Sequence, residues 1–243
     1  MQFETVQFET TILHPVETQG VGLHSGVPVR LRMLPAPAGA GIVFRRTDLE
    51  DFEIPAQGKY VARVSYATSL MRQGVLLSTT EHLLSVLYSL GVDNATIELD
   101  NLEVPILDGS GLPFVELLRK AGTKKLRRPR KYLRITRRIE VSDGAKHLSI
   151  EPADEFIITC ETNYDHRLAG CQRLELVVTP EHYAAEIAPA RTFGFEQDLE
   201  RMRDMGLIRG ATLENAICFT SDGLLNPEGL RFQMSAAATR SWT

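Results

Sequence analysis

The sequence has no long hydrophobic run and no secretion signal. No apolar stretch approaches the ~18 residues that a membrane-spanning helix needs, and the start MQFETVQFET contains no basic stretch followed by an apolar one. We therefore expect neither a membrane span nor secretion. Hydrophobic residues make up 43 % of the 243 residues and charged residues 24 %, which excludes disordered and collagen-like chains.

Cysteine is also scarce. The three residues Cys160, Cys171 and Cys218 are odd in number, form no C-x-x-C pair and lie in mainly apolar or strand-like contexts. This pattern predicts no disulfide framework and no cysteine-based zinc site. We interpret them as reduced thiols of a cytoplasmic protein.

Neither sign of charge dominates the chain. Lys and Arg total 27 against 31 Asp and Glu, so the net charge of −4 provides no field that attracts nucleic acid, and we expect no nucleic-acid partner. The one dense charge run, KKLRRPRK at residues 124–131, is typical of a solvated linker near the middle of the chain. Its alternative role is a patch that meets a phosphate or an anionic membrane face.

The periodicity of apolar residues predicts an α+β protein. Alternation of polar and apolar residues indicates half-buried strands, and a spacing of three to four indicates helices. Length and the central linker favour two similar domains, residues 1–123 and 132–232, each with helices layered on a sheet. The expected strands are residues 27–33, 95–99, 133–141, 147–150 and 156–160, and the expected helices are residues 79–90 and 196–205.

The segment STTEHLLSVL contains the adjacent pair Glu81 and His82 at a helix start. Ser78 and Glu81 have the S-x-x-E spacing of a capping box, which satisfies backbone donors and has no catalytic role. Alternatively, a neutral imidazole at His82 can bind Zn²⁺ while the carboxylate of Glu81 takes a proton from a water. The pair alone does not distinguish these interpretations.

Two further clusters have both structural and functional interpretations. In ARTFGF, Thr192 can cap the next helix or donate to a developing oxyanion beside the ring of Phe193. The glycines of residues 20–26 favour a tight turn between strands, because this segment lacks the lysine of a phosphate-binding P-loop.

Taken in order, these motifs resemble one family. They are TQGVGLHSG (18–26), STTEHLLSVL (78–87), GVDNATIEL (91–99), EVPILDGSGLPF (103–114), ARTFGF (190–195) and LNPEGLRF (225–232). The chain resembles the UDP-3-O-acyl-N-acetylglucosamine deacetylase of lipid A biosynthesis from its first strand to Phe232.

The resemblance implies two domains of ribosomal S5 domain 2-like topology with the active site between them. It also implies removal of the N-acetyl group of UDP-3-O-((R)-3-hydroxyacyl)-N-acetylglucosamine with release of acetate, using Zn²⁺ or, alternatively, Fe²⁺. By the same resemblance, Glu81 is the general base, His82 a metal ligand and Thr192 the oxyanion donor. Phe193, His24 and Asp108 match positions near the substrate, and residues after Phe195, with Gly206 and Gly210, match an insert that accommodates the acyl chain.

The last eleven residues depart from the family pattern. After Phe232 the family has a D-E-x-x-R-H-K-x-L-D helix that supplies a His and an Asp ligand, followed later by a second catalytic His. Residues 233–243, QMSAAATRSWT, contain none of these. One permitted coding of these residues reads Asp-Glu-Cys-Cys-Arg-His-Lys-Val-Leu-Asp in another frame, so we expect an out-of-frame tail, a truncated second domain, weak Zn²⁺ binding and impaired activity.

Two alternatives to an active deacetylase stay open at this point. One is a pseudoenzyme that binds a UDP-sugar or a protein partner. The other is a sugar or small-molecule kinase of the same α+β domain type, for which residues 20–26 are a poor nucleotide loop. We further expect a monomer that contacts the inner membrane face peripherally.

Overall fold

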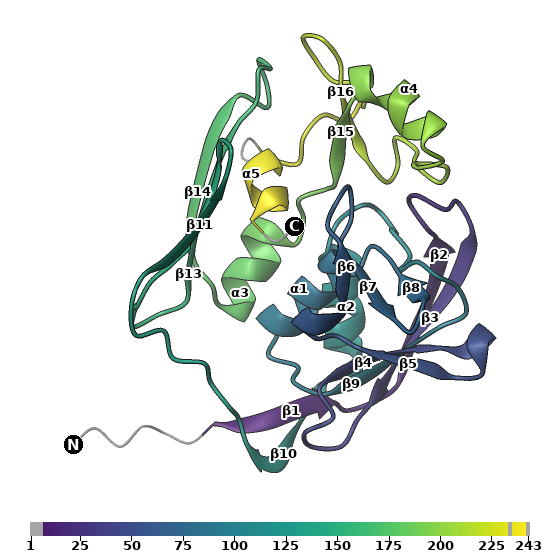
Figure 1. Ribbon diagram of the computed structural model, residues 1–243, viewed down its shortest axis with the longest axis vertical. Helices are drawn as coiled ribbons and strands as arrows, with labels where there is room; N and C mark the ends of the chain where they lie inside the picture. The colour runs from purple at the N-terminus through teal and green to yellow at the C-terminus, as the bar shows by residue number, and fades with distance from the viewer. Residues whose placement is uncertain (1–6, 233–234, 242–243) are drawn as a thin grey trace.

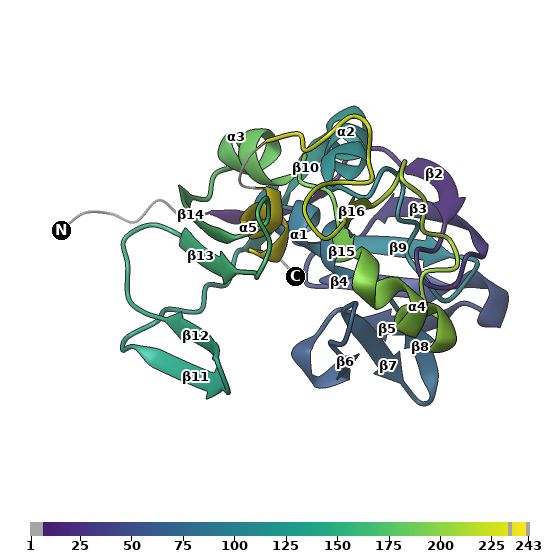
Figure 2. The same ribbon diagram turned by 90° about the horizontal axis from the view of Figure 1, so that it is seen from above.

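The computed structural model describes residues 7–232 and 235–241, and it confirms the predicted α+β class. Several small sheets surround a few helices, and the site described below lies where helices from both halves of the chain meet (Figures 1 and 2). None of the helices in the described ranges has the length and apolarity required to cross a bilayer.

The largest sheet has five strands in the order β2-β3-β9-β4-β5. Its strands are β2 (Val16–Val21), β3 (Pro28–Pro35), β9 (Ala95–Leu99), β4 (Ile42–Arg46) and β5 (Phe52–Pro55). β4 and β9 run parallel, and the other neighbours are antiparallel. Alternate residues of β3 are buried, as the sequence pattern predicted, because successive side chains point to opposite faces of a sheet.

Two helices cover the buried face of this sheet. They are α1 (Glu81–Ser89) and α2 (Leu112–Ala121), and they form one apolar core with the inward-facing side chains of β3, β4, β5 and β9. α1 presents Leu83, Val86 and Leu87 to this core, which is the stripe expected from helical spacing. The expected helix at residues 79–90 is therefore confirmed, with slightly shorter bounds.

Most of the predicted basic linker is a strand. β10 (Thr123–Pro129) pairs antiparallel with β1 (Phe8–Ile12). Lys and Arg are compatible with a strand whose side chains stay in water, and β10 is exposed along nearly its whole length. The irregular connection begins only at Arg130 and continues to residue 138.

Residues 61–77 and 193–219 form two further small sheets and one helix. β6 (Val61–Arg63), β7 (Ser69–Arg72) and β8 (Val75–Leu77) make a three-stranded sheet. β15 (Phe193–Phe195) pairs parallel with β16 (Ile217–Phe219), and α4 (Glu196–Asp204) follows β15 directly. Short 3-10 turns span Thr47–Leu49 and Gly58–Tyr60.

A second group of elements packs against α1 from the other side. β13 (Ile157–Asn163) pairs with β14 (Cys171–Val177), and α3 (Pro180–His182) continues into a π-helical turn, Tyr183–Ile187. Of the predicted out-of-frame tail, Ser235–Arg240 form α5, which packs on β13, β14 and the π-helical turn. Residues 233–234 and 242–243 lie outside the described residues.

The two-stranded ribbon of β11 (Ile139–Asp143) and β12 (Lys146–Ile150) has an uncovered apolar face. Every residue of both strands is exposed. Ile139 pairs with Ile150 and Val141 with Leu148, so these four side chains share one face, with exposed fractions of 49 to 70 %. The strand expected at residues 133–141 is therefore correct only for its last part.

The free energy falls when exposed aliphatic side chains leave water. We therefore expect the ribbon to promote self-association. Replacing Val141 and Leu148 together by Thr keeps β propensity but reduces apolar area. Sedimentation velocity at increasing protein concentration should show less association for this double variant than for the parent. Ser142→Thr with Ser149→Thr, on the opposite face, is the control, and equal association in both double variants would contradict the expectation.

Candidate active site

Helix α1 begins with the two residues that the sequence singled out, Glu81 and His82. The capping-box interpretation is wrong, because Thr80 is the N-cap and makes no side-chain capping bond. The carboxylate of Glu81 instead accepts a hydrogen bond from the backbone N–H of Thr68 at 2.9 Å. Ser78 is hydrogen-bonded to the hydroxyl of Ser69. The acid at the helix start thus reaches the β6–β7 loop.

The buried carboxylate of Glu103 ties this helix start to the glycine-rich turn. It accepts hydrogen bonds from the backbone N–H groups of His24 and Ser25, at 2.9 and 2.8 Å, and from the hydroxyl of Thr79 at 2.8 Å. Thr79 adopts a positive φ of 58°, which a β-branched residue rarely does unless its surroundings impose it. A Cβ on Gly22 would lie 2.3 Å from the Glu103 carboxylate, so only glycine permits this approach.

The turn between β2 and β3 is the tight connection that the sequence predicted. The N–H of Gly26 donates to the carbonyl of Gly22, and the N–H of Gly22 donates to the carbonyl of Val27. The segment after α4 lies against this turn, because the N–H groups of Arg209 and Gly210 donate to the carbonyls of His24 and Leu23.

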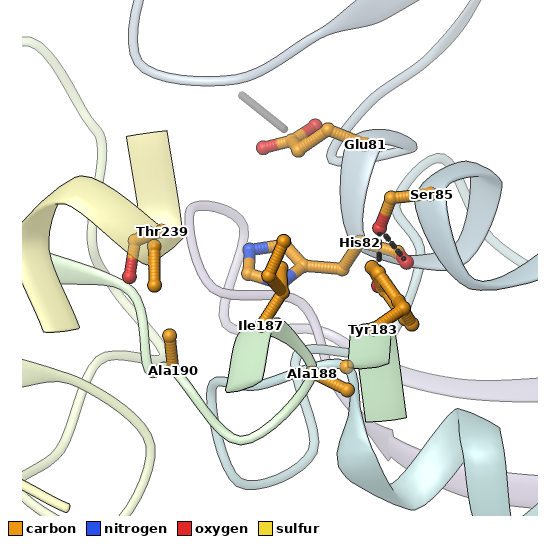
Figure 3. A pocket seen from close by; sticks show the side chains of 10 residues that line it. Glu81, His82, Ser85, Tyr183, Ile187, Ala188, Ala190 and Thr239 are labelled. Atoms are coloured by element: carbon orange, nitrogen blue, oxygen red, sulfur yellow. Dashed lines mark hydrogen bonds between the residues drawn. The ribbon is translucent and has the colours of Figure 1, made fainter. Parts of the chain in front are cut away.

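The imidazole of His82 points into a small cavity of about 20 Å³ between α1, the π-helical turn and α5 (Figure 3). Beneath it, the hydroxyl of Ser85 donates to the carbonyl of His82 at 2.8 Å and is hydrogen-bonded to the hydroxyl of Tyr183 at 2.8 Å. Burial raises the pKa of Tyr183 to about 12, so its phenol keeps its proton. Tyr183 therefore supports the first turn of α1 from the second half of the chain.

A second cavity of about 50 Å³ brings three of the predicted residues together: Glu81, Thr192 and Phe193. Thr239 and Arg240 of α5 also line it, and the guanidinium of Arg240 lies 5.0 Å from the centre of the Phe193 ring. The alternative role of Thr192 as a helix cap is wrong, because α4 begins only at Glu196, with Phe195 as its N-cap. A hydroxyl, a carboxylate and an aromatic wall thus converge on one opening.

Burial shifts the pKa values of both residues at the helix start. It raises the pKa of Glu81, although hydrogen bonds from its own backbone N–H and that of Thr68 oppose the shift. The charge of nearby Glu103 raises the pKa of Glu81 further. Burial lowers the pKa of His82 to about 4, so this imidazole is neutral near pH 7. A neutral imidazole is the form that binds metal ions.

His24 and Asp108 lie outside the residues that line these two cavities. His24 is buried, and its Nε2 lies 3.3 Å from the carbonyl oxygen of Tyr66. Asp108 forms an ion pair with Arg231 at 2.6 Å and accepts hydrogen bonds from Ser110. Burial opposes ionisation of Asp108, but these bonds lower its pKa below the ordinary value.

Arg191, which precedes Thr192, connects three segments of the chain near Asp108. Its buried guanidinium donates to the carbonyl oxygens of Asp108 and Leu213 at 2.9 and 2.7 Å, and pairs with Glu228 at 2.6 Å. A fully partnered arginine of this kind fixes three segments that are far apart in the sequence.

The described residues do not fit a tightly held zinc ion. A catalytic Zn²⁺ site has three protein ligands, whereas the described residues around the first cavity offer one imidazole, His82, and one carboxylate, Glu81. Within residues 7–232 and 235–241, no three His, Cys, Asp or Glu side chains lie together as metal ligands.

Sequence reasoning missed the residues that support the site. Glu103 stands in the quoted EVPILDGSGLPF motif, but nothing in its spacing indicates that it reaches the turn at Gly22. No sequence pattern near Tyr183 indicates its supporting role, because its partner Ser85 is 98 residues away.

We expect Glu103→Gln to lower the free energy of unfolding by about 2–4 kcal/mol, because the amide nitrogen would face donors inside a buried site. Urea denaturation measures the change. Glu53→Gln is the control, since Glu53 is half-exposed and its pair with Arg45 contributes at most about 1 kcal/mol. Equal losses in the two variants would show that the Glu103 carboxylate does not hold the site together.

Comparison with known proteins identifies one family. Residues 9–237 match the LpxC family, UDP-3-O-acyl N-acetylglycosamine deacetylase. A UDP-3-O-acyl-N-acetylglucosamine deacetylase of Solibacter usitatus is 66 % identical over 93 % of this chain and 76 % of its own length. Those of Myxococcus xanthus and Nautilia profundicola are 45 % and 42 % identical, over 92 % and 93 % of this chain and 72 % and 76 % of their own lengths. The chain therefore belongs to the family of UDP-3-O-acyl-N-acetylglucosamine deacetylases of lipid A biosynthesis.

Proposed function

We propose that this site is built for hydrolysis of the N-acetyl group of UDP-3-O-((R)-3-hydroxyacyl)-N-acetylglucosamine, with release of acetate. The convergence of Glu81 and Thr192 on one cavity carries the proposal. The kinase alternative has no comparable support, because the chain belongs to a deacetylase family.

Each residue has a role that follows from its chemistry. The carboxylate of Glu81 takes the proton of the water that attacks the acetamide carbonyl. The hydroxyl of Thr192 donates to the oxyanion that forms. The ring of Phe193 is an apolar wall beside the substrate, and His24 and Asp108 hold the segments that surround it. Residues after Phe195, including Gly206 and Gly210, accommodate the acyl chain.

We further propose that the 243-residue polypeptide holds Zn²⁺ or Fe²⁺ weakly and deacetylates poorly. Counted from Phe232, the His of the family's D-E-x-x-R-H-K-x-L-D helix falls at Ala238 and the Asp at Trp242. Ala238 is buried and lines the same cavity as His82. A methyl group at this position supplies no lone pair to a metal ion.

The exposed ribbon argues against the expected monomer, because it favours self-association. The predictions that stay are two similar S5 domain 2-like domains, a peripheral contact with the membrane, and a frame change after Phe232. The nucleotide sequence of the gene tests the last of these, because it must read D-E-x-x-R-H-K in the shifted frame.

Metal analysis of the dialysed protein tests the proposed impairment. We expect well below one Zn²⁺ per chain in the parent and little turnover of the UDP substrate. Ala238→His should raise the affinity for Zn²⁺ by about 10- to 100-fold, because it adds a second imidazole to the cavity that His82 lines.

Ala238→Leu is the matched control, since leucine fills space without a ligand atom. One tightly held Zn²⁺ in the parent, with turnover, would contradict the impairment. A folded His variant that binds Zn²⁺ no better than the Leu variant would contradict the placement of α5 at the ligand position.

A further inference from the structure

Residues 124–138 form a cationic segment that the proposed catalytic site does not use. They include β10 and the irregular connection that leads to the ribbon, and they run along the outside of the molecule, away from α1 and α5 (Figure 1). Nine of these fifteen residues are Lys or Arg, and none is Asp or Glu.

Most of these cations have no acidic partner in the part of the chain that the structure describes. Arg128 pairs with Glu9, Arg130 with Asp93 and Arg138 with Glu140. Among the described residues, no ion pair involves the other six, of which Lys125 lies over the ring of Phe8. These six side chains are all exposed: Lys124, Lys125, Arg127, Lys131, Arg134 and Arg137.

Apolar side chains are interleaved with the charges. Tyr132 is 66 % exposed and Leu133 is 88 % exposed, between Lys131 and Arg134. The hydroxyl of Tyr132 donates to the side chain of Gln7, and the ring of Tyr132 stays at the surface. An aromatic ring and a leucine flanked by cations are suited to the boundary between lipid headgroups and acyl chains.

The rest of the chain has the opposite charge. The other 228 residues carry 18 Lys and Arg against 31 Asp and Glu. An anionic surface therefore repels most of the molecule and attracts this segment, which orients the protein as it approaches.

We propose that residues 124–138 are a docking surface for a membrane that contains anionic phospholipids. The cations bind the headgroups while Tyr132 and Leu133 enter the interface. A nucleic acid would satisfy the charges equally, but it offers nothing to an exposed leucine. The proposal gives the expected membrane contact a location and a lipid class. Its test is independent of the proposed deacetylation, because docking needs neither a metal ion nor turnover.

Vesicle flotation with the full chain tests the proposal. We expect binding to vesicles of phosphatidylcholine mixed with phosphatidylglycerol, no binding to phosphatidylcholine alone, and weaker binding at high salt. Arg134→Gln with Arg137→Gln should weaken binding by about fivefold per cation, and thus about 25-fold in total. Lys59→Gln with Arg167→Gln removes the same charge elsewhere and should change binding by less than about twofold.

Leu133→Ser separates lipid from other polyanions. It should weaken binding to the anionic vesicles and leave binding to a short DNA duplex unchanged, because only a membrane accommodates the leucine side chain. Circular dichroism confirms that each variant is folded. Equal binding to neutral and anionic vesicles, equal losses in the two charge variants, or no effect of Leu133→Ser on vesicle binding would overturn the proposal.

Discussion

The carboxylate of Glu103 is the constraint on which the candidate site depends. It lies in the protein interior, and no cation pairs with it within residues 7–232 and 235–241. The N–H groups of His24 and Ser25 and the hydroxyl of Thr79 stabilise it instead. A buried charge of this kind is tolerated only when its donors are held in place. The glycine-rich turn and the approach to α1 are therefore locked together, and the positive φ of Thr79 is maintained by this network.

The first turn of α1 is supported from two directions. Glu103 and the backbone of Thr68 position its beginning, while Tyr183 reaches it through Ser85 from the second half of the chain. His82 and Glu81 consequently project into cavities that both halves line. A rigid helix held by buried partners keeps these side chains in the fixed geometry that the proposed hydrolysis requires.

Helix α5 places alanine and threonine side chains beside His82. Ala236, Ala237 and Ala238 pack closely because their side chains are small, and Thr239 and Arg240 reach the cavities. This helix closes the space next to His82 with methyl and hydroxyl groups. The packing is compatible with a folded site, but the chemistry of these side chains does not suit a divalent metal ion.

The sequence by itself determined the α+β class, the strand at Ala95–Leu99, the helix that begins near Glu81 and the family, because periodicity and motif order are local properties. It also indicated the chemical character of Glu81, His82 and Thr192. Only the tertiary structure decided that Glu81 bonds to Thr68 rather than capping its helix, that residues 123–129 are a strand, and that Tyr183 contacts Ser85. The reason is physical: these outcomes depend on partners brought together by burial and strand pairing, and no spacing along the chain records which distant groups will meet.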